Sequence, residues 1–184
     1  MKFKDDITAE FAKSIFRYDP ENGKLFWKER SPNMFLEKKK SPEHCCAIWN
    51  ANNANKEITY KNNYGYIVAR INRKSYLASR IIWLLNYGEN PKFEIDHIDM
   101  NKENNKIDNL RPSSRSQNGC NRGLQKNNIS GYKGVGFCRV KNKWRSRIMI
   151  NKKEKFIGYF DTPKEAYEAY KRAARQYHGE YARI

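Results

Sequence analysis

The chain has 184 residues, enough for one ordinary domain or two small ones, and it carries 37 Lys and Arg residues against 20 Asp and Glu residues. The formal net charge of +17 excludes an electrostatically indifferent surface, because self-repulsion on this scale weakens a compact state unless a polyanion neutralises it. Nucleic acid is therefore the expected partner. With 39% hydrophobic and 14% aromatic residues, the composition also excludes a wholly disordered chain.

No two of the four cysteines have the Cys-x-x-Cys spacing of a tetrathiolate site, so we expect no structural zinc. The first residues contain no apolar signal-peptide core, and the longest apolar run, residues 81–85, is too short to cross a bilayer. We expect a cytoplasmic protein with no membrane partner.

The positive charge is unevenly distributed along the chain. Residues 1–92 carry 17 basic and 10 acidic side chains, residues 93–129 carry 6 and 5, and residues 130–184 carry 14 and 5. The middle segment is nearly neutral and rich in Asp, Asn and Ser. A basic protein that keeps carboxylates in one short stretch is a candidate to hold a cation there.

In the N-terminal part, helical spacing over residues 8–16 precedes a turn cluster that ends at Gly23 and a short strand at 24–28. Residues 31–63 have no clear period, which predicts a long basic loop that contacts DNA or orders only on a partner. A hairpin with strands at 64–71 and 76–78 follows, and then a helix over 79–87 that Gly88 ends.

The C-terminal part contains three strand-like segments, at 135–140, 144–150 and 155–160. A helix begins after them at a capping box, Thr162-Pro-Lys-Glu165, and Gly179 lies just past its end. Side chains alternate along the second strand, with Trp144, Ile148 and Ile150 on one face and Arg145, Arg147 and Met149 on the other.

Between these parts, Asp96 and His97 end a short apolar strand, a polar loop of about ten residues follows, and residues 109–111 form a return strand. A helix opens at Pro112 and contains Asn118. A strand pair with a helix can bring Asp96 and Asn118 together as hard oxygen ligands. An imidazole beside a bound cation is equipped to activate a water molecule.

These residues resemble the HNH nucleases, which have the ββα-metal fold, in the branch of phage-borne and free-standing homing endonucleases. The matching segments are Asp96-His97, Asn109-Leu-Arg111, Ser116-Gln-Asn118, Tyr76-Leu-Ala-Ser-Arg80 and Asn118-Gly-Cys-Asn-Arg122.

The resemblance implies that His97 is the general base, that Asp96 and Asn118 bind one divalent metal, and that Asn109 fixes the loop that presents the histidine. The implied metal is Mg²⁺, with Mn²⁺ able to substitute, and the implied origin is a phage or a bacterium. Two positions depart from the pattern: Ser79 stands where many relatives have histidine, and Met100 where many have glycine.

An AP2-type DNA-binding domain, in which the sheet face away from the helix lies in the major groove, resembles this part of the chain at residues 130–135, 143–144, 158–162, 165–166, 169–170 and 178–179. The resemblance implies that the face with Arg145 and Arg147 binds DNA. Gly136 stands where AP2 relatives often carry a base-contacting arginine, which implies weaker sequence readout.

We therefore expect an α+β protein: an N-terminal basic region over 1–63, an HNH ββα-metal nuclease domain over 64–125, and an AP2-like domain over 130–184 with a small three-stranded antiparallel sheet and one helix. The expected activity is metal-dependent hydrolysis of double-stranded DNA by a monomer or homodimer. The expected DNA-binding residues are Arg80, Arg111, Arg115, Arg122, Lys133, Arg139, Arg145, Arg147 and Lys155.

Alternatives remain open from the sequence. Arg111, Arg115 and Arg122 either clamp phosphates or form ion pairs with Asp99, Glu103 or Asp108. The alternative to an endonuclease is a non-catalytic, sequence-specific DNA-binding regulator that uses the AP2-like part.

Overall fold

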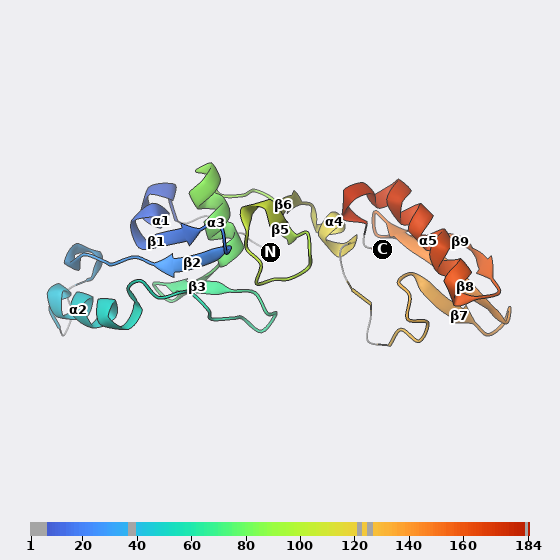
Figure 1. Ribbon diagram of the computed structural model, residues 1–184, viewed down its shortest axis with the longest axis horizontal. Coiled ribbons are helices and arrows are strands. Elements are labelled where there is room, and N and C mark those ends of the chain that lie inside the picture. The colour runs from blue at the N-terminus through green and yellow to red at the C-terminus, as the bar shows by residue number, and fades with distance from the viewer. Residues whose placement is uncertain (1–6, 37–39, 121–122, 125–126, 183) are drawn as a thin grey trace. The chain divides into compact units, whose positions relative to one another are not determined.

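The computed structural model describes residues 7–36, 40–120, 123–124, 127–182 and 184. The chain forms two compact units, Met1–Pro112 and Ser113–Ile184 (Figure 1). Within the part of the chain that the structure describes, none of the helices has the length and apolar character needed to cross a membrane.

Unit 1 contains three two-stranded sheets and three helices among its described residues. Its strands pair as β1–β2, β3–β4 and β5–β6, and the first two pairs are antiparallel. The elements are α1 (Ala9–Ile15), β1 (Phe16–Asp19), β2 (Lys24–Trp27), the 3-10 turn η1 (Pro32–Met34), α2 (Pro42–Asn53), β3 (Val68–Ile71), β4 (Lys74–Leu77), α3 (Ala78–Tyr87), β5 (Glu94–His97), the 3-10 turn η2 (Ile107–Asn109) and β6 (Leu110–Ser113).

Local signals explain the element boundaries. The Thr8 hydroxyl accepts a hydrogen bond from the Phe11 backbone N–H and so caps α1. Asn72 and Arg73 have φ of 48° and 64°, which closes the β3–β4 hairpin with the backbone twist that two-residue turns need. Gly88 ends α3 in the left-handed conformation, with φ of 76°. The predicted hairpin and helix are therefore confirmed.

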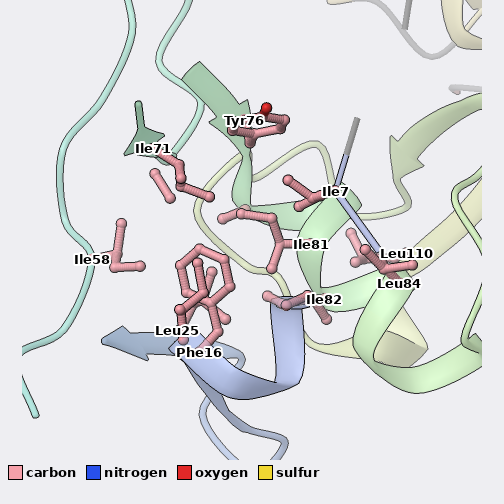
Figure 2. Close-up of a cluster of buried hydrophobic side chains, with 14 residues drawn as sticks. Ile7, Phe16, Leu25, Ile58, Ile71, Tyr76, Ile81, Ile82, Leu84 and Leu110 are labelled. Carbon is pink, nitrogen blue, oxygen red and sulfur yellow. The ribbon is translucent and has the colours of Figure 1, made fainter. Parts of the chain in front are cut away.

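One hydrophobic core is built around α3, and it joins residues from both sides of position 64. The buried face of α3 contributes Ile81, Ile82 and Leu84, which are at most 1% exposed. Figure 2 shows side chains gathered against this face from the segment before α1, from β1 and β2, from the segment between α2 and β3, and from β3, β4 and β6: Ile7, Phe16, Leu25, Ile58, Ile71, Tyr76 and Leu110. The N-terminal region thus belongs to the same packed unit as the HNH-like motif, whereas the sequence divided them at residue 64.

The irregular loop expected over 31–63 is wrong for residues 42–53, which form α2. Ser41 caps this helix through the His44 backbone N–H, and Pro42 occupies its first turn. Only Cys46 of α2 is buried, so the helix has no apolar period to recognise. Its anchor is aromatic: Trp49 lies 5.5 Å from Trp27 between ring centroids, in an edge-on arrangement.

Unit 2 contains the predicted three-stranded antiparallel sheet, in the order β7–β8–β9, with a helix packed on one face. Ile148 of the middle strand is buried with Tyr170 and Ala174 of the helix. Thr162 and Glu165 form the predicted capping box. The elements are α4 (Arg115–Cys120), β7 (Val135–Cys138), β8 (Lys143–Ile150), β9 (Lys153–Phe160), α5 (Pro163–His178) and the 3-10 turn η3 (Gly179–Tyr181).

The shared core predicts that damage in the N-terminal strands destabilises all of unit 1. Leu25→Ala removes a side chain that is 3% exposed and should lower the free energy of unfolding by about 2–5 kcal/mol. Leu36→Ala, the same change at a side chain that is 78% exposed, should cost under about 0.5 kcal/mol. Urea denaturation followed by tryptophan fluorescence measures both, and equal effects would contradict a shared core.

Candidate active site

The HNH-like motif lies on β5, the loop of residues 98–109 and β6. Leu110 of β6 is buried in the core, and Ile95 of β5 packs against it, so both ends of the loop are anchored. Asp96 and His97 end β5 as predicted and are only 5% and 4% exposed. Buried polar groups need partners, and those partners define the site.

One partner of His97 is the side chain of Asn105, which is 2% exposed. The His97 Nε2 atom lies 3.0 Å from the Asn105 Oδ1 atom. An amide oxygen can only accept, so Nε2 donates its hydrogen and the lone pair of the neutral ring is on Nδ1. Burial lowers the pKa of His97 below its ordinary value, against the hydrogen bond to Asn105 and the charges of Asp99 and Asp96. Burial thus favours the neutral ring, and the Asn105 oxygen favours the tautomer with its hydrogen on Nε2.

Asn109, at the end of the loop of residues 98–109, forms hydrogen bonds to Asp99 at its start and to Asn104 in its middle. Its Nδ2 atom donates to the Asp99 Oδ1 atom at 2.9 Å and to the Asn104 carbonyl at 2.7 Å, while its Oδ1 atom accepts from the Asp99 backbone N–H. Burial acts to raise the pKa of Asp99, but hydrogen bonds from Asn104, Asn109 and the Asn101 backbone outweigh it and lower that pKa. Asp99 therefore serves the internal bonding of the loop.

Arg111 lies against Asp96. Its Nε and Nη2 atoms donate to the Asp96 Oδ2 atom at 3.0 and 2.8 Å, and both side chains are largely buried. The sequence offered Asp99, Glu103 and Asp108 as ion-pair partners for Arg111, and the structure pairs Arg111 with Asp96. Glu103 pairs with Lys61 at 2.7 Å.

The two departures from the family pattern have different settings. Ser79 is buried, 4% exposed, in the first turn of α3. Met100 has a φ of 66°, a conformation that favours glycine, and its side chain is 40% exposed. The loop therefore keeps the backbone geometry of a glycine position although methionine occupies it.

The predicted DNA-binding residues nearest to this motif in the sequence have different settings. Arg80 donates to the backbone carbonyls of Phe93 and Pro91 and so ties α3 to the segment before β5. In unit 2, Arg115 is exposed at the start of α4, and Asn118, a predicted metal ligand, lies on the same helix. Arg122 lies outside the described residues.

On the sheet of unit 2, the predicted alternation is confirmed. Ile148 faces α5, while Arg145 is paired across the strands with Gly136 and Tyr159 on the opposite face. Arg147 lies on that open face and forms an ion pair with Glu154. Lys155 differs, because it is paired with Ile148 and its Nζ atom contacts the Tyr177 hydroxyl of α5. Lys133 and Arg139 lie in the turns flanking β7, with Lys133 partly buried and Arg139 exposed.

Sequence reasoning missed two residues of this site. Asn105 is one of four asparagines in the loop, and nothing in the pattern singles out the one that meets His97. Tyr18 is far away in sequence, yet its hydroxyl accepts a hydrogen bond from the Ile107 backbone N–H at 2.9 Å. Neither contact has a local sequence signal.

No group of three or more His, Cys, Asp or Glu side chains among the described residues is arranged to hold a metal ion. The predicted ligands, one carboxylate and one amide, are of the oxygen type that Mg²⁺ takes together with water and phosphate oxygens. The donor chemistry therefore fits such an ion.

Residues 76–120, which span β4 to α4, match the family described as HNH endonuclease. The chain is similar to Protein 3.8 of Escherichia phage T7, with 33% identity over 104 residues, which are 56% of this chain and 85% of that protein. No solved structure matches the chain significantly. This chain therefore belongs to the same family as Protein 3.8 of phage T7 and carries an HNH endonuclease domain at residues 76–120.

Proposed function

We propose that the protein is a metal-dependent DNA endonuclease, of the homing-endonuclease type, that hydrolyses phosphodiester bonds with His97 as general base. The observation that supports this most strongly is the buried contact of His97 with Asn105, 3.0 Å long, inside the segment that matches HNH endonucleases. A neutral histidine with one nitrogen held by a fixed acceptor is prepared to take a proton at the other.

In this mechanism, the His97 Nδ1 atom takes a proton from a water molecule as the water oxygen attacks phosphorus. The bond from phosphorus to the 3′ oxygen breaks, the leaving oxygen takes a proton from solvent water, and the products carry 3′-hydroxyl and 5′-phosphate ends. Asn105 keeps its Oδ1 atom on the Nε2 hydrogen and stabilises the imidazolium that forms. Asn109 holds the loop that carries Asn105.

Asp96 and Asn118 would hold the divalent ion, Mg²⁺ or Mn²⁺, with water and DNA phosphate oxygens completing its ligands. When bound, the ion supplies positive charge that stabilises the charge building up on the phosphate and on the leaving oxygen. Arg111 orients Asp96 through its two hydrogen bonds to the Oδ2 atom.

The open face of the β7–β8–β9 sheet is the proposed DNA-binding surface of unit 2, in the manner of an AP2-type domain. It carries Arg145 and Arg147 and the exposed side chains of Met149, Phe156 and Tyr159. Residues 130–184 contain 14 basic and 5 acidic side chains, which suits a phosphate backbone. Lys155 contacts α5 and is left out of this surface.

Replacing the general base should abolish cleavage and spare binding. His97→Ala should lower the rate of Mg²⁺-dependent nicking of supercoiled plasmid by roughly 10²–10⁴-fold. Its affinity in a gel shift should persist, because the imidazole is buried. His44→Ala, at an exposed histidine of α2, is the matched control and should cleave normally. Equal cleavage by wild type and His97→Ala would refute the mechanism, and binding without any cleavage by the wild type would favour the DNA-binding regulator.

The pH dependence of cleavage should report the same imidazole. Since burial lowers the pKa of His97, the rate should rise with pH and level off with a midpoint below about 6.5, the ordinary value for histidine. A bound cation moves the midpoint further in the same direction. Single-turnover rates from pH 5 to pH 8 provide the test, and a midpoint well above 7 would contradict a buried neutral base.

The sheet surface predicts a charge-specific effect on binding. Arg145→Ala should weaken binding to duplex DNA about tenfold and make the slope of log affinity against log salt shallower by about one unit if the arginine contacts phosphate. Arg172→Ala removes the same charge from an exposed position of α5 and should change binding less. Fluorescence anisotropy across salt concentrations compares the two, and indistinguishable variants would exclude the open face as the contact surface.

A further inference from the structure

The loop segment of residues 105–107 is held by a hairpin that lies outside the HNH match at residues 76–120. Tyr18 of β1 reaches this segment with its hydroxyl. The hydroxyl accepts a hydrogen bond from the Ile107 backbone N–H at 2.9 Å and donates one to the Asn105 carbonyl oxygen at 3.3 Å. One side chain therefore bonds to the backbone on both sides of Lys106.

The turn of the same hairpin presses against this backbone. Gly23 joins β1 to β2 with a φ of 67°, and a Cβ atom placed on it would lie 2.5 Å from the Lys106 backbone nitrogen and 2.9 Å from the Asn105 carbonyl carbon. No real Cβ contact is that short, so any side chain at position 23 displaces the loop or the turn. Glycine is required there for close approach as well as for its conformation.

The hairpin is itself fixed, because Phe16 and Leu25, one on each strand, are 3% exposed in the core of unit 1. The segment it holds carries the Asn105 side chain, whose oxygen contacts the His97 Nε2 atom at 3.0 Å. A path of direct contacts thus runs from the core through the hairpin and the backbone of Asn105 to His97.

We propose that Tyr18 and Gly23 are positioning residues for the reaction: the β1–β2 hairpin sets the place of Asn105, and Asn105 sets the orientation of His97. This inference rests on the proposed role of His97 as the base. It makes the N-terminal hairpin part of the nuclease, although the family segment begins at residue 76.

The glycine is tested against a matched control. Gly88 has a φ of 76°, and nothing lies within 4 Å of a Cβ atom placed on it, so Gly88→Ala carries the conformational strain without the clash. Gly23→Ala should lower kcat on the order of 10²-fold, the loss expected from a displacement of about 1 Å at a catalytic group, with KM for DNA unchanged. Gly88→Ala should leave both constants near those of the wild type.

The hydroxyl is tested by Tyr18→Phe, which keeps the ring and should lower kcat about tenfold, as loss of a positioning hydrogen bond does. Tyr87→Phe, at an exposed tyrosine of α3, is its control. Nuclear magnetic resonance compares six proteins: the wild type, Asn105→Ala and the four variants named above. The ¹⁵N signals of the His97 ring should change in Tyr18→Phe, Gly23→Ala and Asn105→Ala only.

Two outcomes separate the possible failures. If the wild type cleaves DNA and the hairpin variants lose no more activity than their controls, the inference is overturned while the proposed function stands. If the wild type cleaves nothing, the proposed function fails, and the ¹⁵N signals of the His97 ring then decide the inference about positioning. A change restricted to the hairpin variants and Asn105→Ala supports positioning of His97, and the absence of that change overturns it. Should Gly23→Ala fail to fold, Tyr18→Phe alone is judged by these criteria.

Discussion

The contact between the His97 Nε2 atom and the Asn105 Oδ1 atom is the interaction that the loop of residues 98–109 and the β1–β2 hairpin hold in place. Both side chains are nearly inaccessible to water, so a lost partner would leave a buried polar group unsatisfied. The contact is maintained from two directions. Asn109 bonds the loop internally, and Tyr18 with Gly23 holds its backbone from outside.

The electrostatics of the middle segment follow from these contacts. The nearly neutral charge of residues 93–129 suggests that carboxylates are kept there to bind a cation, but three of these carboxylates have partners within the protein. Asp99 bonds to asparagines within the loop, Glu103 pairs with Lys61, and Asp96 pairs with Arg111. Among these three carboxylates, Asp96 is the one proposed as a metal ligand, together with the amide of Asn118. A single carboxylate already oriented by an arginine suits an ion that takes most of its remaining ligands from water and phosphate.

The sequence predicted well where signals are local. The capping box at Thr162, the end of α3 at Gly88 and the alternation along β8 all depend on neighbouring residues, and the structure contains them. It predicted poorly where stability comes from distant packing. The helix α2 is held by Trp49 against Trp27, a contact that leaves no apolar period. The core shared by Leu25 and Ile82, and the approach of Tyr18 to the loop, likewise join residues far apart in the chain.

The most direct test of the central contact changes the charge of the partner and keeps its shape. Asn105→Asp replaces the neutral acceptor of His97 with a carboxylate, which stabilises the imidazolium and raises the pKa of the base. In single-turnover cleavage, we expect the acid limb of the rate–pH profile of Asn105→Asp to lie at higher pH than that of the wild type. A limb that stays at the wild-type pH would contradict the claim that Asn105 holds the general base.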